Sequence, residues 1–144
     1  MASVYGSGDT AGTQLRPQYD DVLDAARAIW QHTQGHEGGT FAASTGELNE
    51  YTSGYVVALG QGTALIATDE REDVAVALIA AYIQQQPINA RTLCRPNIGT
   101  WTHEGLVYVD AVELVEDRQQ ALALAAQRGE LAIWDNAAGE EISV

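Results

Sequence analysis

Lysine is absent from this chain of 144 residues, and its seven positively charged side chains are all arginines. The absence of lysine excludes Schiff-base chemistry and an amine acting as general base. Twenty Asp and Glu residues oppose the arginines and give a formal net charge of −13. Such a chain repels phosphate and anionic lipid, so we expect no direct binding to nucleic acid and none to a membrane surface. A GC-rich genome exchanges Lys for Arg, and this bias accounts for the composition without a functional role for the missing lysine.

Cysteine is almost absent, because Cys94 is the only one. It cannot form an internal disulfide, which fits a reducing compartment, and we expect a buried, inert thiol. The first residues, "MASVYGSGDTAGTQ", lack the basic and apolar parts of a secretory signal. The longest apolar run, "VAVALIAAYI" at residues 74–83, has about half of the ~20 residues that a membrane-spanning helix needs. We therefore expect a cytoplasmic protein without a cofactor, whose oligomeric state stays open.

The apolar fraction of 46% and charged fraction of 19% are typical of one soluble domain. Residues 1–16 are rich in Gly, Ser and Thr and predict a flexible tail, so the domain is expected to span residues 17–144. A first helix is predicted from Pro17 to Gly35. Its apolar face follows the spacing i, i+3, i+4, i+7 through Tyr19, Val22, Leu23, Ala26, Ile29, Trp30 and Thr33.

The middle of the chain predicts a hairpin and a second helix. Residues up to Gly54 indicate a loop or a short irregular strand. Residues 55–59 and 63–67 are β-prone and flank "GQG", which predicts a hairpin. Asp69 and Glu72 have the spacing of a helix N-cap and its partner, so a buried helix is expected at residues 70–86, ending at Pro87.

The last third predicts a second hairpin, a third helix and one or two more strands. The hairpin arms are residues 98–101 and 106–115, joined by "THEG", and a break in alternation near Val112 indicates a bulge. Asp117 is expected to cap a helix at residues 118–128. Residues 131–134 and 141–144 complete the strands. The order predicts an α+β domain with an antiparallel sheet of about five or six strands and three helices mainly on one side.

Several short segments carry a resemblance to other proteins. They are "GTW" at 99–101, "VYVD" at 107–110, "DRQQALALA" at 117–125 and "LAIWD" at 131–135. Together they resemble a module of small uncharacterised proteins of actinobacterial phages and mobile elements, and the upstream "GGTFAASTGE…TSGYVVAL" is similar to the same group. The resemblance covers residues 38–142. It implies a protein of a phage or mobile element in the cytoplasm of a bacterial host, and it implies no reaction.

Three histidines raise the question of a metal site. His32 and His36 are four residues apart with Glu37 adjacent, and His103 lies elsewhere. Zinc would need three or four converging ligands. Because Gly35 should end the helix between the first two, we expect them to lie on no common face and to hold no metal. Whether His103 joins them stays open at this point.

A cluster of acids follows the long predicted strand. Asp110, Glu113, Glu116 and Asp117 are close in sequence, and paired carboxylates can serve acid–base catalysis. Glu116 and Asp117, however, occupy positions that a helix start explains. The glycine-containing "GQGTAL" and "HEGGTF" lack the phosphate-binding patterns and are expected to be turns. A small hydrolase or transferase that uses Asp110 or the His32/His36 region therefore remains only an alternative.

The sequence favours a non-enzymatic protein-interaction module, an accessory protein that binds and modulates a host or phage protein with a basic surface. A sharper form of this hypothesis is that its acids mimic the charge of DNA, and a third possibility is a virion-associated structural protein. Aromatic residues on strands, including Trp134, are expected to be partner anchors or half-buried pairs. The expected contact residues are Asp69, Glu70, Glu72, Asp73, Asp110, Glu113, Trp101 and Tyr108.

Overall fold

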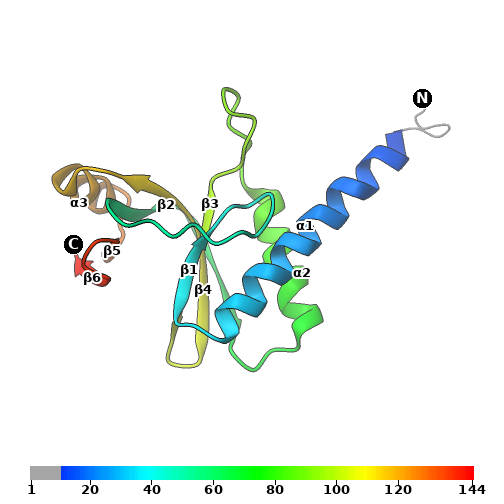
Figure 1. The fold of residues 1–144 in the computed structure, drawn as a ribbon, viewed down its shortest axis with the longest axis horizontal. Helices are drawn as coiled ribbons and strands as arrows, with labels where there is room; N and C mark the ends of the chain where they lie inside the picture. Colours follow the sequence, from blue (N-terminus) through cyan, green and yellow to red (C-terminus); the bar gives the residue numbers. More distant parts are fainter. Residues whose placement is uncertain (1–10) are drawn as a thin grey trace.

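The computed structural model describes the chain from residue 11 onward, with side chains from residue 21 (Figure 1). Its elements are α1 (Ala11–Gln34), β1 (Gly38–Phe41), β2 (Tyr55–Ala67), α2 (Glu72–Gln85), β3 (Asn97–His103), β4 (Leu106–Val115), α3 (Arg118–Gln127), β5 (Ala132–Asp135) and β6 (Glu140–Ser143). The six strands found in this part form one curled antiparallel sheet, a half-barrel, in the order β1-β3-β4-β2-β5-β6. The predicted α+β class, with three helices on an antiparallel sheet, is confirmed.

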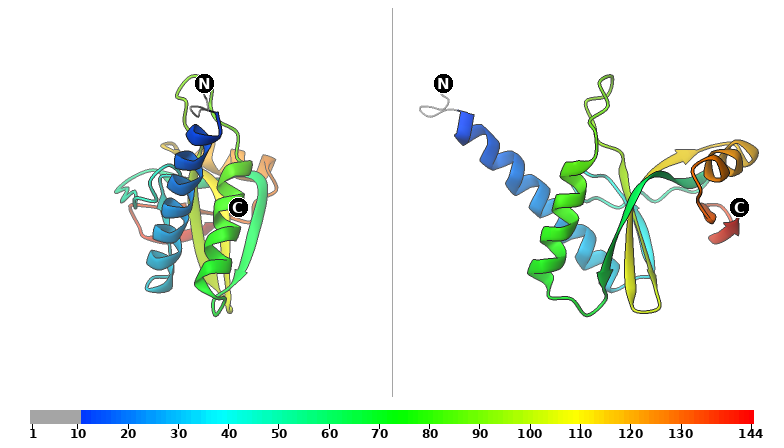
Figure 2. Two further views of the ribbon diagram at one scale, coloured as in Figure 1. Left: turned by 90° about the vertical axis from the view of Figure 1, so that its right-hand side faces the viewer. Right: turned by 180° about the vertical axis from the view of Figure 1, so that it is seen from behind.

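Helix α1 is longer than the sequence indicated. It begins at Ala11 rather than at Pro17, and it ends at Gln34, directly before the predicted stop at Gly35. Residues 1–10 of the predicted tail lie outside the described residues, whereas residues 11–16 belong to the helix. Helix α1 crosses α2, which covers the same side of the sheet (Figure 2). The part of the predicted apolar face that is buried consists of Val22, Ala26, Ile29, Trp30 and Thr33.

Strand β2 corrects the first predicted hairpin. Residues 55–59 and 63–67 are not two arms that fold back on each other, because both pair with β4 within one continuous strand. The predicted number of strands is nevertheless right, since β1 lies in the segment that the sequence indicated as a loop or short irregular strand. It pairs with β3 at the edge of the sheet.

A bulge in β2 explains why the chain does not reverse there. The register against β4 shifts between Ala58 and Thr63, where β2 has more residues than the segment opposite. Gly60 and Gly62 lie in this stretch with φ of 73° and 94°, values that glycine adopts without the steric cost of a side chain. The sequence placed the bulge near Val112 of β4, which is wrong: the extra residues are in β2. A bulge of this kind bends its strand and increases the local twist.

Two side chains hydrogen-bond the backbone around the bulge. The Tyr82 hydroxyl of α2 donates to the carbonyl of Gly62 at 2.7 Å and accepts from the backbone N–H of Ala111 at 2.8 Å. On the other side, the Arg128 guanidinium donates to the carbonyl of Ala58 at 3.2 Å. These contacts satisfy backbone groups next to the interrupted ladder, where an unpaired buried group would be costly.

The start of α2 differs from the prediction, whereas the start of α3 agrees with it. Helix α2 has Arg71 at its N-cap and no side-chain cap, so Asp69 does not cap it. Glu70, the residue before Arg71, lies in a turn, where its N–H donates to the carbonyl of Ala67 at 3.0 Å. Asp117, in contrast, caps α3 by accepting from the N–H of Gln120 at 2.8 Å. The predicted β3–β4 hairpin is also present.

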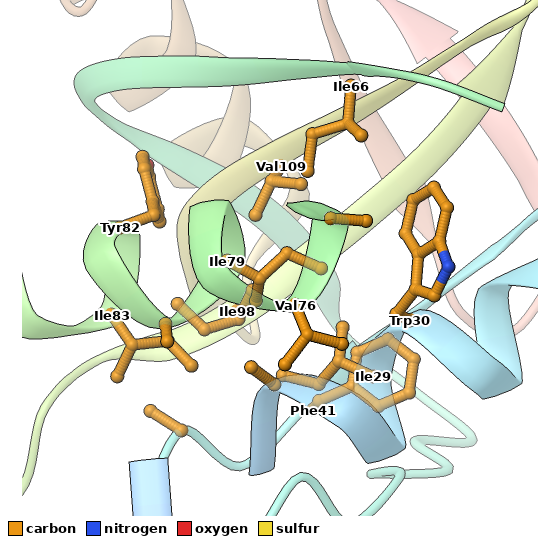
Figure 3. Packing of buried hydrophobic residues seen from close by; sticks show 14 of the residues in the cluster. Ile29, Trp30, Phe41, Ile66, Val76, Ile79, Tyr82, Ile83, Ile98 and Val109 are labelled. Atoms are coloured by element: carbon orange, nitrogen blue, oxygen red, sulfur yellow. The ribbon is translucent and has the colours of Figure 1, made fainter. Parts of the chain in front are cut away.

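Two hydrophobic cores lie on one face of the sheet. The larger lies between the sheet and helices α1 and α2, and Ile29, Ile79 and Val109 are fully buried in it (Figure 3). The smaller lies under α3 and consists of Val57, Val115, Ala121, Ala125 and Ile133. In the register of β2 with β4, the strand side chains of both cores alternate with those of the opposite face. The helices therefore cover one face and leave the other open.

Candidate functional site

The open face of the sheet forms a pocket of about 930 Å³. Its strand side chains alternate with those of the cores: Thr63 from β2, Trp101 from β3, Tyr108 and Asp110 from β4, and Trp134 from β5. The segment between β1 and β2 and the segment between α3 and β5 complete its rim. Ligand-binding pockets commonly have about 300–1,000 Å³, so this one has room for more than a single side chain.

Two tryptophans show how strongly the sheet curls around the pocket. Trp101 and Trp134 lie in β3 and β5, which β4 and β2 separate. Three strand spacings of about 4.8 Å would put these strands roughly 14 Å apart in a flat sheet. Their indole centroids are nevertheless only 5.8 Å apart, with the planes tilted by 47°. The two side chains therefore meet across the concave face, and Tyr108, opposite Trp101 in the register, extends this aromatic wall.

Asp110 lies half-buried in the same pocket. Thr63 is directly opposite it on β2, and the Thr63 hydroxyl donates a hydrogen bond to Asp110 Oδ1. Burial raises the pKa of Asp110, and the Thr63 hydrogen bond opposes this shift. The pKa of Glu130 is raised first by burial and then by the charge of Asp110, while Arg128 lowers it. Both carboxylates are thus disfavoured in their ionised forms, and a nearby cation would stabilise them.

Carboxylates dominate the charge of the pocket. The acids that line it are Glu37, Glu50, Asp110, Glu130 and Glu141. Within residues 21–144, no arginine lines it, and His36 is the basic residue at its rim. Acidic groups beside aromatic rings attract organic cations through ion pairing and cation–π interaction. The arrangement is therefore suited to bind a positively charged group.

The two histidines at the end of α1 correct a prediction. Gly35 does not keep them apart: the rings of His32 and His36 stack with centroids 3.9 Å apart and planes at 2°. His36 reaches back over the last turn, with its Nδ1 2.8 Å from the His32 carbonyl oxygen. Burial, and then the charge of His36, lowers the pKa of His32. His103 lies elsewhere, beside Glu104 at 3.4 Å, and in the described residues no group of three potential ligands converges on a metal position.

The acids at the start of α2 lie outside the pocket. None of the predicted contact residues Asp69, Glu70, Glu72 and Asp73 lines it. Arg71 pairs with Asp73 at 3.3 Å, and Arg27 of α1 pairs with Glu72 at 3.8 Å. These ion pairs are exposed, so they stabilise the fold little. The structure therefore separates this acidic segment from the acids of the sheet.

Three of the predicted contact residues do come together, namely Trp101, Tyr108 and Asp110. The fourth on the sheet, Glu113, does not line the pocket, because it is opposite Val57 of the smaller core and so lies on the face that the helices cover. Its carboxylate pairs there with Arg128 at 2.6 Å. The side chain is consequently engaged within the fold rather than presented to a partner.

Sequence reasoning did not select Thr63 and Glu130 for the site. Thr63 was placed in the arm of a hairpin that does not exist, so nothing put it opposite Asp110. Glu130 follows α3 in a connecting segment, where a single acid gives no signal of its own. Had β2 been predicted as one strand paired with β4, Thr63 would have been placed opposite Asp110. The wrong topology is therefore the reason that Thr63 was missed.

The single cysteine is not buried, contrary to the prediction. Cys94 is exposed in the segment between α2 and β3, which projects from the body of the molecule (Figure 1). Hydrogen bonds within the segment form a turn, in which the Asn89 carbonyl accepts from the Leu93 N–H at 2.7 Å.

Comparisons of the chain with protein-family models, with curated proteins and with solved structures gave no match. What the fold and the site define is thus a structural class, a half-barrel with helices on one face and an acidic, aromatic pocket on the other. No helix in residues 11–144 is both long enough and apolar enough to cross a membrane.

Proposed function

We propose that the protein is a non-enzymatic interaction module whose open sheet face binds a basic segment of a partner protein. In a bacterium that harbours a phage or mobile element, as the sequence resemblance implies, the partner is a host or phage protein that this binding modulates. The observation that carries the proposal is the pocket itself. Its carboxylates and the aromatic rings of Tyr51, Trp101, Tyr108 and Trp134 line one concave surface.

Charge and shape both support this function. The net charge of −13 speeds the encounter with a basic surface. Tryptophan and tyrosine are the residues that most often contribute large binding energies at protein interfaces. Because the acids are divided between the pocket and the start of α2, we do not extend the proposal to mimicry of a row of DNA phosphates.

The test is binding of short basic peptides, compared with matched peptides in which glutamine replaces each basic residue. We expect only the basic peptides to bind, and more weakly as salt is added. In NMR spectra, the indole N–H signals of Trp101 and Trp134 should shift on binding. Trp30 is buried in the main core and is an internal control whose signal should stay unchanged.

Two charge-matched variants locate the binding surface. The double variant Glu130→Gln/Glu141→Gln removes two carboxylates from the pocket, and the control Asp69→Asn/Glu70→Gln removes two from outside it. We expect the first to weaken binding by about fivefold, since each exposed ion pair contributes roughly 0.2–1 kcal/mol. The control should bind nearly as the unmodified protein does. Equal losses in the two variants, or no binding of any basic peptide, would contradict the proposal.

The raised pKa of Asp110 favours a second candidate, a small hydrolase or transferase that uses this carboxyl as a general acid or base. Asp110 accepts its hydrogen bond from the Thr63 hydroxyl, however, and in the described residues no second acid or histidine bonds it to complete a catalytic pair. A panel of ester, glycoside and phosphoester substrates tests this candidate. Turnover that falls by about a hundredfold or more in Asp110→Asn would support it and would count against the binding module.

A further inference from the structure

The pocket contains one position at which an aromatic pair and a half-buried carboxylate are neighbours on the same face of the sheet. The Trp101–Trp134 pair supplies the aromatic surface, because the curl of the sheet brings the two indoles to 5.8 Å. Asp110 supplies the carboxylate from β4, one of the two strands that lie between β3 and β5. Trp101 is opposite Tyr108 in the register, and Asp110 follows two residues further along β4 on the same face. Diagonal neighbours of this kind are roughly 7–8 Å apart, so the carboxylate borders the aromatic pair.

We propose that this position takes the side chain of one arginine of the partner, whose guanidinium lies against the Trp101–Trp134 pair and donates hydrogen bonds to Asp110. The inference rests on the proposed function and deepens it, because it names the group that the pocket selects. The rest of the basic segment then lies along the remaining acids of the rim.

The free acceptor capacity of Asp110 supports a hydrogen-bonding cation. A carboxylate has about four lone-pair sites on its two oxygens. Thr63 donates to Oδ1, and Oδ2 receives no hydrogen bond from any residue that the structure describes. A guanidinium, with its several N–H donors, can reach this oxygen while its plane stacks on an indole.

Arginine fits this position better than the other organic cations. Lysine is more strongly hydrated and does not stack, so it loses more on entering a half-buried aromatic site. A quaternary ammonium has no N–H and would leave Asp110 Oδ2 without a hydrogen bond. The structure therefore predicts the order arginine, lysine, trimethyl-lysine in decreasing affinity.

The experiment compares peptides that differ at one position only. The position holds arginine, lysine, trimethyl-lysine or citrulline, which is the uncharged isostere of arginine, and fluorescence anisotropy measures the affinity. We expect arginine to bind about tenfold or more tightly than citrulline, as hydrogen bonds to charged groups suggest. Lysine and trimethyl-lysine should lie between them, in that order.

Two variants assign the selectivity to its residues. Asp110→Asn keeps an acceptor for Thr63 and should reduce the preference for arginine over citrulline to less than about threefold. Trp134→Phe keeps an aromatic ring with a weaker cation–π surface and should reduce the preference of arginine over lysine. Glu116→Gln removes an exposed charge that does not line the pocket, so it should leave both ratios unchanged. Thermal unfolding of each variant checks that the fold is intact.

The outcomes separate the two proposals. If arginine and lysine peptides bind equally and Asp110→Asn weakens both alike, the pocket recognises charge only; the proposed function then stands and the arginine site is wrong. If trimethyl-lysine binds most tightly, the arginine site is wrong as well. If no basic peptide binds, both proposals fail.

Discussion

At the scale of single residues, Asp110 shows most clearly how burial disfavours the ionised form of a carboxyl group. Burial raises its pKa above the value of about 3.9 for an unfolded aspartate. The folded protein therefore binds this proton more tightly than the unfolded chain does. The resulting stability is fully present below the unfolded pKa and is lost as the pH rises through the folded pKa.

Replacing Asp110 by asparagine should remove this pH dependence. We expect Asp110→Asn to be more stable than the unmodified protein at neutral pH, because the variant buries no charge and keeps an acceptor for Thr63. The difference should shrink as the pH falls through the folded pKa of Asp110 toward about 4. Urea unfolding at a series of pH values measures it. A difference that stays constant with pH would show that the titration of Asp110 is not its cause.

The same carboxyl links stability to binding. A cation bound to Asp110 favours its ionised form, so the cost of burying the charge falls when the pocket is occupied. The residue is thus unfavourable for the free fold and, in the proposed complex, would be favourable for binding, a combination that is common where a site serves function rather than stability.

At the scale of elements, the bulge in β2 lies beside the pocket, between the lining residues Ala58 and Thr63. It bends the strand between its two paired segments, and the hydroxyl of Tyr82 bonds backbone groups on both sides of the interruption, on Gly62 and on Ala111. Because bulges increase the local twist of a strand, we infer that this one contributes to the curl that brings Trp101 of β3 and Trp134 of β5 together. Helix α2 therefore supports the bulge beside the pocket although it lies on the opposite face of the sheet.

The variant Tyr82→Phe tests this connection. It removes both hydrogen bonds and leaves the Ala111 N–H without its partner, so the free energy of unfolding should fall by about 1–3 kcal/mol. Near-ultraviolet circular dichroism should also change, because the Trp101–Trp134 contact depends on the curl. Tyr55→Phe is the control, since the Tyr55 hydroxyl makes no hydrogen bond with another described side chain or backbone group. Should the two variants lose the same stability, the bulge would not depend on the Tyr82 hydroxyl.

The same elements show how far sequence reasoning reaches. Helices and the β3–β4 hairpin were predictable because local periodicity, caps such as Asp117 and turn residues agree with the final fold. The "GQG" segment was not, because glycines with positive φ occur both in hairpin turns and in bulges. Only the pairing of both halves of β2 with β4 distinguishes the two, and that contact lies far along the chain. Part of the site was lost with it, since Thr63 reaches Asp110 only through this pairing.

At the scale of the whole molecule, the two cores differ greatly in size. The core under α1 and α2 contains 17 buried residues, and the core under α3 contains five, within the part of the chain that the structure describes. Strand β5 is joined to β2 through the pairs Tyr55–Asp135 and Val56–Trp134, and β6 lies beyond it at the edge. The end of the molecule that carries α3, β5 and β6 lies away from α1 and α2 (Figure 2). Less apolar surface therefore stabilises this end.

Hydrogen exchange should reveal this difference as two levels of protection. We expect backbone amides of β5, β6 and α3 to exchange at least about tenfold faster than those of β3 and β4, because local opening requires only the small core to separate. Trp134 belongs to the weaker end and Trp101 to the stronger one, so a ligand that contacts both must hold the two ends together. A bound basic peptide should therefore slow exchange in β5 more than in β3. Uniform protection without ligand would mean that the sheet opens as one unit, and the wall of the pocket that carries Trp134 would then be as rigid as the rest.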